Sequence, residues 1–384
     1  MAAVEELALN CGGPVFEPYI PKFLEALAPL TESFTRTFVA LWPRPWLRLS
    51  STVRGFARLE RASWRGFSRI LREVVVEKTF NAFKAMSARV GPVVTMDYMN
   101  ELMRITKTVL AHEHVCQTTH EEDEDEEEVG GRICAGKSAS ELVGVLAKCY
   151  GEQFLGTFQE LFPALLSFAT GLRAVRDRAA AVGCFAEVLR ELGPAALGFV
   201  ESVFPVVLQG LASDNYVLKA NSAFCMGILA ELSGDKLVSA YEQMLQALRP
   251  LFESAGNDEV VIDNACAAVA RMIIAGGANM PLEAVLPVFL GALPLKTDMD
   301  ESPVCFRCLN GLVSSQNPVA LNMMPQVLDV YAKALAPTSS VEEETQVEVK
   351  VCVRGLLQAY KAQMKEVIAR MSPDAQAALS SALN

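Results

Sequence analysis

The sequence predicts an all-α fold, in which antiparallel helix pairs stack side by side into a superhelix, an α-solenoid. Three observations predict it. Apolar residues recur at spacings of three and four, paired segments repeat at a nearly constant step, and no sustained alternating run marks a strand. The chain has 384 residues, 51% of them hydrophobic and 21% charged, so it can bury a long apolar core.

Amphipathic helices follow one another from about residue 155 onward. One has its apolar residues at Leu161, Phe162, Leu165, Leu166, Ala169 and Leu172. Another has them at Val217, Ala220, Phe224, Cys225, Ile228, Leu229 and Leu232. Together with similar segments, these patterns predict helical pairs near 15–30, 77–115, 140–192, 195–232, 237–275, 282–314 and 321–370.

The step between pairs is close to 40 residues. Phe162-Pro163 and Phe204-Pro205, 42 apart, each open a predicted first helix, and Leu286-Pro287 and Met324-Pro325 mark two later ones. In the second helices Asn221 recurs 43 residues later as Asn264, and Ala186-Glu187 recurs 44 later as Ala230-Glu231. A two-helix repeat of this length is typical of HEAT and armadillo arrays.

One helix pair cannot cover its own apolar face, so it must stack on the next pair. Small residues would let neighbouring helices approach closely where they cross, at Ala223, Gly227, Ala267 and Ala270. Stacking with a small rotation leaves a long surface lined by the second helices, which suits another protein.

Four segments carry a family resemblance. The stretches 217–231 (VLKANSAFCMGILAE) and 261–272 (VIDNACAAVARM) resemble successive second HEAT helices of the importin-beta (karyopherin-beta) family, and 292–298 (ALPLKTD) is similar to the loop after them. With 16–20 (FEPYI), they resemble the C-terminal half of the family's importin four branch. The resemblance covers roughly residues 10–30 and 77–384. Residues 36–72, with nine Arg, no Lys and all three Trp, depart from it.

The resemblance implies a nuclear transport receptor that shuttles between cytoplasm and nucleus and imports basic cargo such as histones or ribosomal proteins. It implies contacts with nucleoporins, and release of cargo by the GTPase Ran. The family's main Ran-binding repeats lie in its N-terminal half, which the resemblance does not cover. We expect a partial HEAT repeat at 1–30, an atypical Arg/Trp-rich segment at 31–76, a repeat at 77–118, an acidic disordered loop at 119–139 and a continuous array at 140–384.

An acidic run is the main candidate for cargo binding. It consists of Glu121, Glu122, Asp123, Glu124, Asp125, Glu126, Glu127 and Glu128. Eight adjacent carboxylates repel one another and cannot pack, so we expect a loop that attracts a basic partner or, alternatively, a solvated linker. The acidity is local: the formal charge is −11, and without the run 37 acids face 34 bases.

Further cargo contacts are expected on the second helices at Asn221, Glu231, Asp263 and Asn264, which are polar residues at repeat-equivalent or helix-end positions. The alternative for such positions is that they cap or lock neighbouring helices. A HEAT scaffold unrelated to import, for example an assembly platform or a regulatory subunit, is the alternative function.

Several motifs could carry chemistry, but each has a simpler interpretation. Gly131 to Ser138 has P-loop spacing, yet an acidic run precedes it where a buried strand is needed, so we expect Ser138 or Ser140 to cap a helix starting near Glu141. His112, His114, Cys116 and His120 cluster, but a helix would point the first two to different faces. Cys305 and Cys308 are expected in a packed turn. We therefore expect no enzyme activity, metal or cofactor.

A rival binding surface is basic. Arg54, Arg58, Arg61, Arg65, Arg69 and Arg72 step by three or four residues and form one stripe, which could grip nucleic acid or an anionic membrane, or pair with the acidic run. We expect neither nucleic acid nor membrane as the main partner. The N-terminus lacks the features of a secretory signal, so the expectation is a soluble intracellular protein whose ten cysteines are reduced and mostly in the core.

Overall fold

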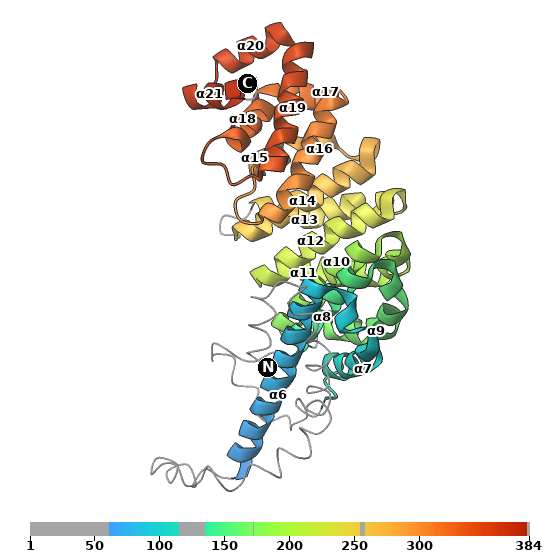
Figure 1. The fold of residues 1–384 in the computed structure, drawn as a ribbon. Coiled ribbons are helices and arrows are strands. Elements are labelled where there is room, and N and C mark those ends of the chain that lie inside the picture. Colours follow the sequence, from blue (N-terminus) through green and yellow to red (C-terminus); the bar gives the residue numbers. More distant parts are fainter. Residues whose placement is uncertain (1–60, 115–134, 172, 254–257, 382–384) are drawn as a thin grey trace. The chain divides into compact units, whose positions relative to one another are not determined.

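The computed structural model describes residues 61–114, 135–171, 173–253 and 258–381, and within them the side chains of all but 61–75, 235 and 278. These residues form helices joined by short connections, and none of them lies in a strand (Figure 1). The prediction of an all-α fold is therefore confirmed. The acidic run and residues 1–60 lie outside the described residues.

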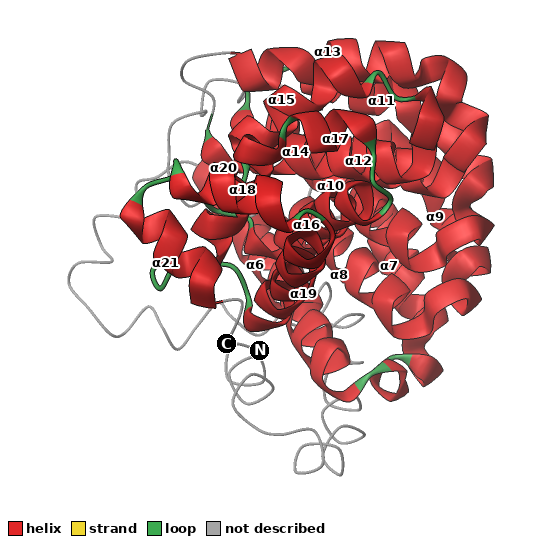
Figure 2. Ribbon diagram, turned by 90° about the horizontal axis from the view of Figure 1, so that it is seen from above, coloured by secondary structure: helices red, strands yellow, loops and turns green. Residues whose placement is uncertain are grey.

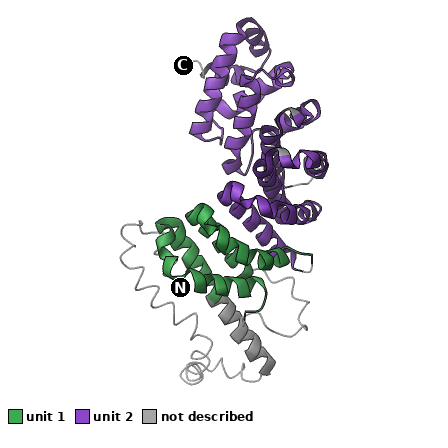
Figure 3. Ribbon diagram, turned by 90° about the vertical axis from the view of Figure 1, so that its right-hand side faces the viewer, with its two compact units in different colours: residues 1–173 green, residues 174–384 purple. Residues whose placement is uncertain are grey.

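The chain divides into two compact units, residues 1–173 and 174–384 (Figure 3). In the first unit α6 packs on α8 and α7 on α9, and α7 also contacts α8. Its described elements are α6 (Arg61–Val90), η3 (Pro92–Val94), η4 (Met96–Tyr98), α7 (Met99–Leu110), α8 (Ala135–Tyr150), η5 (Gly151–Phe154) and α9 (Leu155–Phe168).

The second unit begins with α10, continues with four helix pairs, with the short α17 between the third and the fourth, and ends with two short helices. Its elements are α10 (Val175–Leu192), η6 (Gly193–Phe199), α11 (Val200–Leu211), α12 (Tyr216–Ser233), η7 (Gly234–Ala240), α13 (Tyr241–Glu253), α14 (Glu259–Gly276), η8 (Gly277–Asn279), α15 (Leu282–Ala292), η9 (Met299–Glu301), α16 (Ser302–Ser314), α17 (Pro318–Asn322), α18 (Met324–Leu335), α19 (Glu343–Ala359), α20 (Lys361–Ala369) and α21 (Pro373–Ser381).

Two rows of helices make up the second unit. The second helices α10, α12, α14, α16 and α19 pack successively on one another and form what we call the second-helix row. Seen from above, α11, α13 and α15 lie on one side of that row (Figure 2). The predicted pairs at 195–232, 237–275, 282–314 and 321–370 correspond to α11–α12, α13–α14, α15–α16 and α18–α19, with α20 included in the last range.

Small residues permit a close helix crossing in the second unit, between α12 and α14. A Cβ atom at Gly227 would lie 2.8 Å from the Cα of Ala268, and Ala223, Ala267 and Ala270 are fully buried. The sequence prediction for these small residues is confirmed. Because the backbones meet at van der Waals distance, α12 and α14 share an interface with little room for a longer side chain.

The second helices α12 and α14 share their capping chemistry. The side chains of Asn215 and Asp258 accept a backbone N–H bond at the starts of α12 and α14, from Leu218 (3.0 Å) and Val260 (3.1 Å). α10, α12 and α14 end next to glycines with a positive φ of 53°, 47° and 49°, at positions 193, 234 and 277. Because such a φ strains any residue with a Cβ, these glycines fix the point where each second helix stops.

The prolines of the first helices correct one expectation. Pro163 and Pro205 do not open their helices but lie inside α9 and α11, as Pro250 and Pro287 lie inside α13 and α15. Of the predicted openings, Pro325 alone sits in a first turn, that of α18. A proline beyond the first turn removes one backbone hydrogen bond from its helix.

Two further boundaries differ from the predicted ones. Helix α6 runs without a break from Arg61 to Val90 and so crosses the expected change of segment at residue 76. The division between the units falls after Arg173, inside the range predicted as one continuous array, and that continuity stays a prediction.

The segment Val175–Leu211 is long and apolar enough, by length and composition, to cross a membrane. It is folded as two helices, α10 and α11, joined by η6. Each of these helices is shorter than the roughly 20 residues that a membrane-spanning helix needs.

Candidate protein-binding surfaces

Asn221, one of the predicted cargo contacts, joins two second helices. Its Nδ2 on α12 donates a hydrogen bond of 2.8 Å to the backbone oxygen of Ala179 on α10. The space for this amide depends on Gly183, where a Cβ would lie 2.9 Å from the same nitrogen. The amide therefore acts between neighbouring repeats, which is the alternative role considered for such positions.

Asp263 organises the loop that follows α15. Only 2% of the residue is exposed, and its carboxylate accepts hydrogen bonds from the backbone N–H groups of Lys296, Thr297 and Asp298. The hydroxyl of Thr297 donates a further bond of 2.8 Å. A buried carboxylate needs such donors, and these hydrogen bonds hold the loop against α14.

Asn264 adds a second connection to the same loop. Its Nδ2 donates to the backbone oxygen of Val260 and to a carboxylate oxygen of Asp298, both at 2.9 Å. Burial raises the pKa of the Asp298 carboxyl, and the bond from Asn264 opposes that rise. Like Asn221, Asn264 uses its amide nitrogen for hydrogen bonds inside the array.

Glu231 differs from the other three because its side chain is exposed at the end of α12. One of its oxygens accepts a bond of 3.1 Å from Nε of Arg271 on α14. The remaining carboxylate surface faces solvent, so Glu231 is the predicted contact that is open to a partner.

Arg271 is the buried centre of a charged cluster. Its side chain is 8% exposed and forms an ion pair with Glu301, which is 7% exposed, in addition to the bond with Glu231. Burial acts to lower the pKa of Arg271, but the hydrogen bond and charge of Glu301, with the charge of Glu231, outweigh it and raise the pKa. The pair thus ties α14 to the start of α16.

The cluster continues across three second helices. The guanidinium carbon atoms of Arg190 on α10 and Arg271 on α14 lie 5.6 and 5.5 Å from the ring centre of Phe224 on α12, in cation–π geometry. Glu187 and Glu191 pair with Arg190. We missed this arrangement in the sequence, although one arginine within the apolar stretch 265–275 was the available signal.

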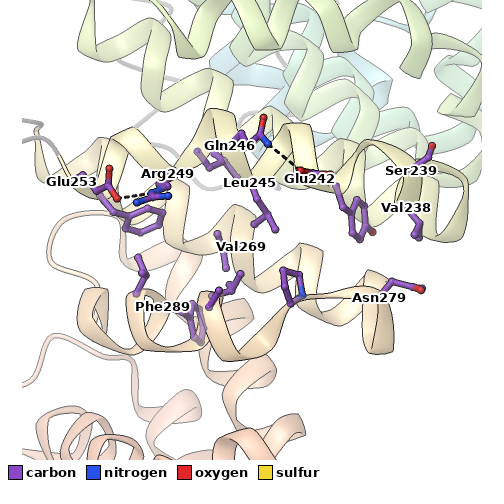
Figure 4. Close-up of a pocket in the computed structure, with 17 residues that line it drawn as sticks. Val238, Ser239, Glu242, Leu245, Gln246, Arg249, Glu253, Val269, Asn279 and Phe289 are labelled. Carbon is purple, nitrogen blue, oxygen red and sulfur yellow. Dashed lines mark hydrogen bonds and ion pairs between the residues drawn. The ribbon is translucent and has the colours of Figure 1, made fainter.

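An apolar groove lies between the first helices α13 and α15 (Figure 4). Its volume is about 920 Å³, within the range of sites that hold a drug-sized group, and Val269 on α14 contributes to its wall. Leu245, Val288 and Phe289 supply apolar surface. Two pairs, Glu242 with Gln246 (3.2 Å) and Arg249 with Glu253 (2.6 Å), lie along α13.

The motifs with a possible chemistry occupy ordinary structural positions. Helix α8 begins at Ala135, so Ser138 and Ser140 lie inside it, and the prediction that one of them caps the helix is wrong. The Ser140 hydroxyl donates to the backbone oxygen of Gly136. Gly136 is needed for packing, because a Cβ there would lie 2.5 Å from the Phe168 ring. Cys305 and Cys308 are buried within α16.

The histidines also differ from the expected picture. Helix α7 ends at Leu110, so His112 and His114 follow the helix, and the His112 ring lies 5.7 Å from that of Phe168. Cys116 and His120 lie outside the described residues. In the part of the chain that the structure describes, no three His, Cys, Asp or Glu side chains could hold a metal ion together.

Two importins are similar in sequence to this chain. The probable importin subunit beta-4 of Schizosaccharomyces pombe is 26% identical over 276 residues, covering 68% of this chain and 25% of that protein. Importin-4 of Homo sapiens is 30% identical over 239 residues, covering 62% of this chain and 22% of that protein. No family model matches the chain. Over these regions the chain is similar in sequence to importins of the importin-beta family.

Two solved structures share the fold of this chain. Kap121p bound to Pho4p superposes with a TM-score of 0.59 at 12% identity, over 99% of this chain and 36% of that one. Importin beta gives 0.58 at 14% identity, over 93% and 39%. The HEAT-repeat α-solenoid is thereby confirmed. The chain spans about a quarter of the length of the curated relatives it matches.

Proposed function

We propose that the chain is a segment of a nuclear transport receptor that binds basic cargo proteins, such as histones or ribosomal proteins, and shuttles with them between cytoplasm and nucleus. The kinship to importins supports this proposal most directly. Kap121p, which shares the fold, binds other proteins, among them Pho4p and the SUMO protease Ulp1p. The relatives are transport proteins, so a role in binding fits this chain better than catalysis does.

The acidic run, residues 121–128, is the proposed region of attraction for cargo. Its eight carboxylates follow α7 and precede α8 in the chain, and they account for most of the excess negative charge. Attraction of this kind acts over roughly 8 Å at physiological salt and speeds the encounter with a basic protein. Glu231, exposed on the second-helix row, is the proposed contact within the array.

Binding of purified core histones to the full chain tests the proposal. Replacing the run by Gln and Asn should weaken binding about tenfold at low salt and much less at high salt, because salt screens the attraction. The matched control neutralises eight exposed acids scattered over the described residues, at Asp97, Glu152, Glu160, Glu201, Asp214, Glu283, Asp300 and Asp374. Equal affinity of the two variants at low salt would contradict a role for the run.

The alternative, a HEAT scaffold outside nuclear import, predicts a different response. An import receptor segment should accumulate with labelled histones in the nuclei of permeabilised cells, whereas a scaffold should leave the histones where they were. Ran is proposed to act through repeats that this chain does not include, so adding GTP-locked Ran to the isolated chain should leave histone binding unchanged.

Nucleoporins are the second proposed partner, and the groove between α13 and α15 is the proposed contact. The exposed Val288 and the half-buried Leu245 line the groove with apolar surface, and an aromatic or aliphatic side chain of a partner can pack against them. The double variant L245S/V288S should lose binding to a purified nucleoporin segment. The variant V217S, at an exposed valine on α12, is the control and should bind normally.

A further inference from the structure

Helix α19 exposes an apolar pair. Val347 and Val351 are 52% and 62% exposed and stand one turn apart. The other side of α19 is buried against α16 and α18, through Thr345, Val349, Cys352, Val353 and Leu356. The exposed valines therefore form a face of their own, separate from the core.

No described residue covers this face. On α14 most residues are buried, because second helices pack on both of its flanks. The corresponding packing of α19 comes from α16 alone among the second helices. One turn beyond Val351, a Cβ added at Gly355 would have no atom within 4 Å. Exposed valines on an otherwise packed helix indicate a surface that a partner covers.

Glutamates flank the valines. Glu344 and Glu348 share the face with Val347 and Val351, at positions i, i+4, i+3 and i+7, and both are exposed. Their carboxylates make no ion pair or hydrogen bond with the described part of the chain, and neither do those of Glu342 and Glu343. The basic residues of α19, Lys350 and Arg354, lie nearer its C-terminal end.

A purely structural account explains part of this pattern. Carboxylates in the first turn of a helix interact favourably with its dipole, which accounts for Glu343 and Glu344. The effect fades beyond the first turn, so it does not account for Glu348. It also gives no reason for two valines that remain more than half exposed.

We propose that the face formed by Glu344, Val347, Glu348 and Val351 binds a basic amphipathic segment of a cargo protein. Lysine or arginine side chains of that segment pair with the glutamates, and its apolar side chains cover the valines. Charge complementarity selects this occupant, because an acidic or purely apolar segment would leave the glutamates desolvated and unpaired. The inference rests on the proposed function and assigns one contact of the cargo to α19.

A synthetic helical peptide tests this surface. The peptide carries leucines at i, i+3, i+4 and i+7 and lysines elsewhere, and its binding is followed by fluorescence anisotropy. The full chain is used with its acidic run neutralised, so that attraction to the run does not contribute. Both V347S/V351S and E344Q/E348Q should weaken binding about tenfold. The control V93S/M96S changes residues of similar exposure, 49% and 62%, and should leave binding unchanged.

Several outcomes would overturn the proposal. Normal peptide binding by either α19 variant is one, and equal binding of a peptide whose leucines are replaced by glutamine is another. A third is a wild-type dimer that V347S/V351S converts into a monomer, since the face would then join two copies. Helical circular dichroism of each variant checks that its fold is intact, which we expect for substitutions at exposed positions.

The two proposals fail in different ways. If core histones bind the chain but the peptide does not, the proposed function stands and the α19 contact is wrong. If the chain binds neither histones nor the peptide, both are wrong. If the α19 substitutions weaken the binding of histones as well as of the peptide, the same face serves the cargo.

Discussion

At the scale of single residues, burial decides between binding and architecture. Asn221, Asp263 and Asn264 have the polarity expected of contact residues, yet their side chains join adjacent helices and loops. Glu231 has the same sequence signature and faces solvent. Sequence could place all four on second helices, but it could not show that Glu231, of these four, keeps an exposed side chain.

The first prediction concerns Asp263. In D263A three backbone N–H groups and the Thr297 hydroxyl lose their acceptor, so we expect the second unit to lose about 3 kcal/mol of stability. Urea unfolding followed by circular dichroism measures the change.

The control for Asp263 is D329A. Asp329 is an exposed carboxylate on α18 that pairs with Lys333, and its loss should cost at most about 0.5 kcal/mol. Similar unfolding midpoints for D263A and D329A would contradict the structural role of Asp263.

At the scale of helices, the sequence is most informative where the packing is tightest. Small residues spaced along 217–231 and 261–272 predict a close crossing, and α12 and α14 make it. The start of α8 was misplaced because the Gly-Lys-Ser signal resembles a loop, although Gly136 lies in the helix and makes room for Phe168.

The second prediction compares two glycines. In G227A the new methyl group would meet the backbone of Ala268, and we expect a loss of about 1–3 kcal/mol from overpacking. In G311A, inside α16, the methyl group meets nothing within 4 Å, so the lower backbone entropy of alanine should stabilise the chain by about 0.5–1 kcal/mol. Thermal unfolding distinguishes the two signs, and a stabilised G227A would contradict the close crossing.

At the scale of the whole molecule, the thiols report on the core. Cys184, Cys225, Cys266, Cys305, Cys308 and Cys352 are buried, one or two on each second helix of the second unit, while Cys149 is half-buried. Burial raises the pKa of the Cys184, Cys225 and Cys308 thiols, so they stay protonated at neutral pH. Protonated thiols are poor nucleophiles.

The third prediction concerns the rates at which buried and half-buried cysteines react with an alkylating reagent. Among the seven cysteines in the described part of the chain, iodoacetamide at about pH 8 should label Cys149 well before the six buried thiols, and denaturant should make all of them react. Mass spectrometry of the digested chain gives the rate for each cysteine. Native labelling of Cys266 or Cys305 as fast as Cys149 would mean that the second-helix row opens readily.

The sequence by itself determined the repeated helix pairs and the small residues at the crossing of α12 and α14. These are local patterns that each repeat must carry in order to fold against its neighbours. Only the tertiary structure showed which polar side chains form hydrogen bonds inside the array. It also showed the groove between the first helices α13 and α15 and the exposed face of α19. Those features depend on which flank of a helix its neighbours cover, and the periodicity of a single helix does not contain that information.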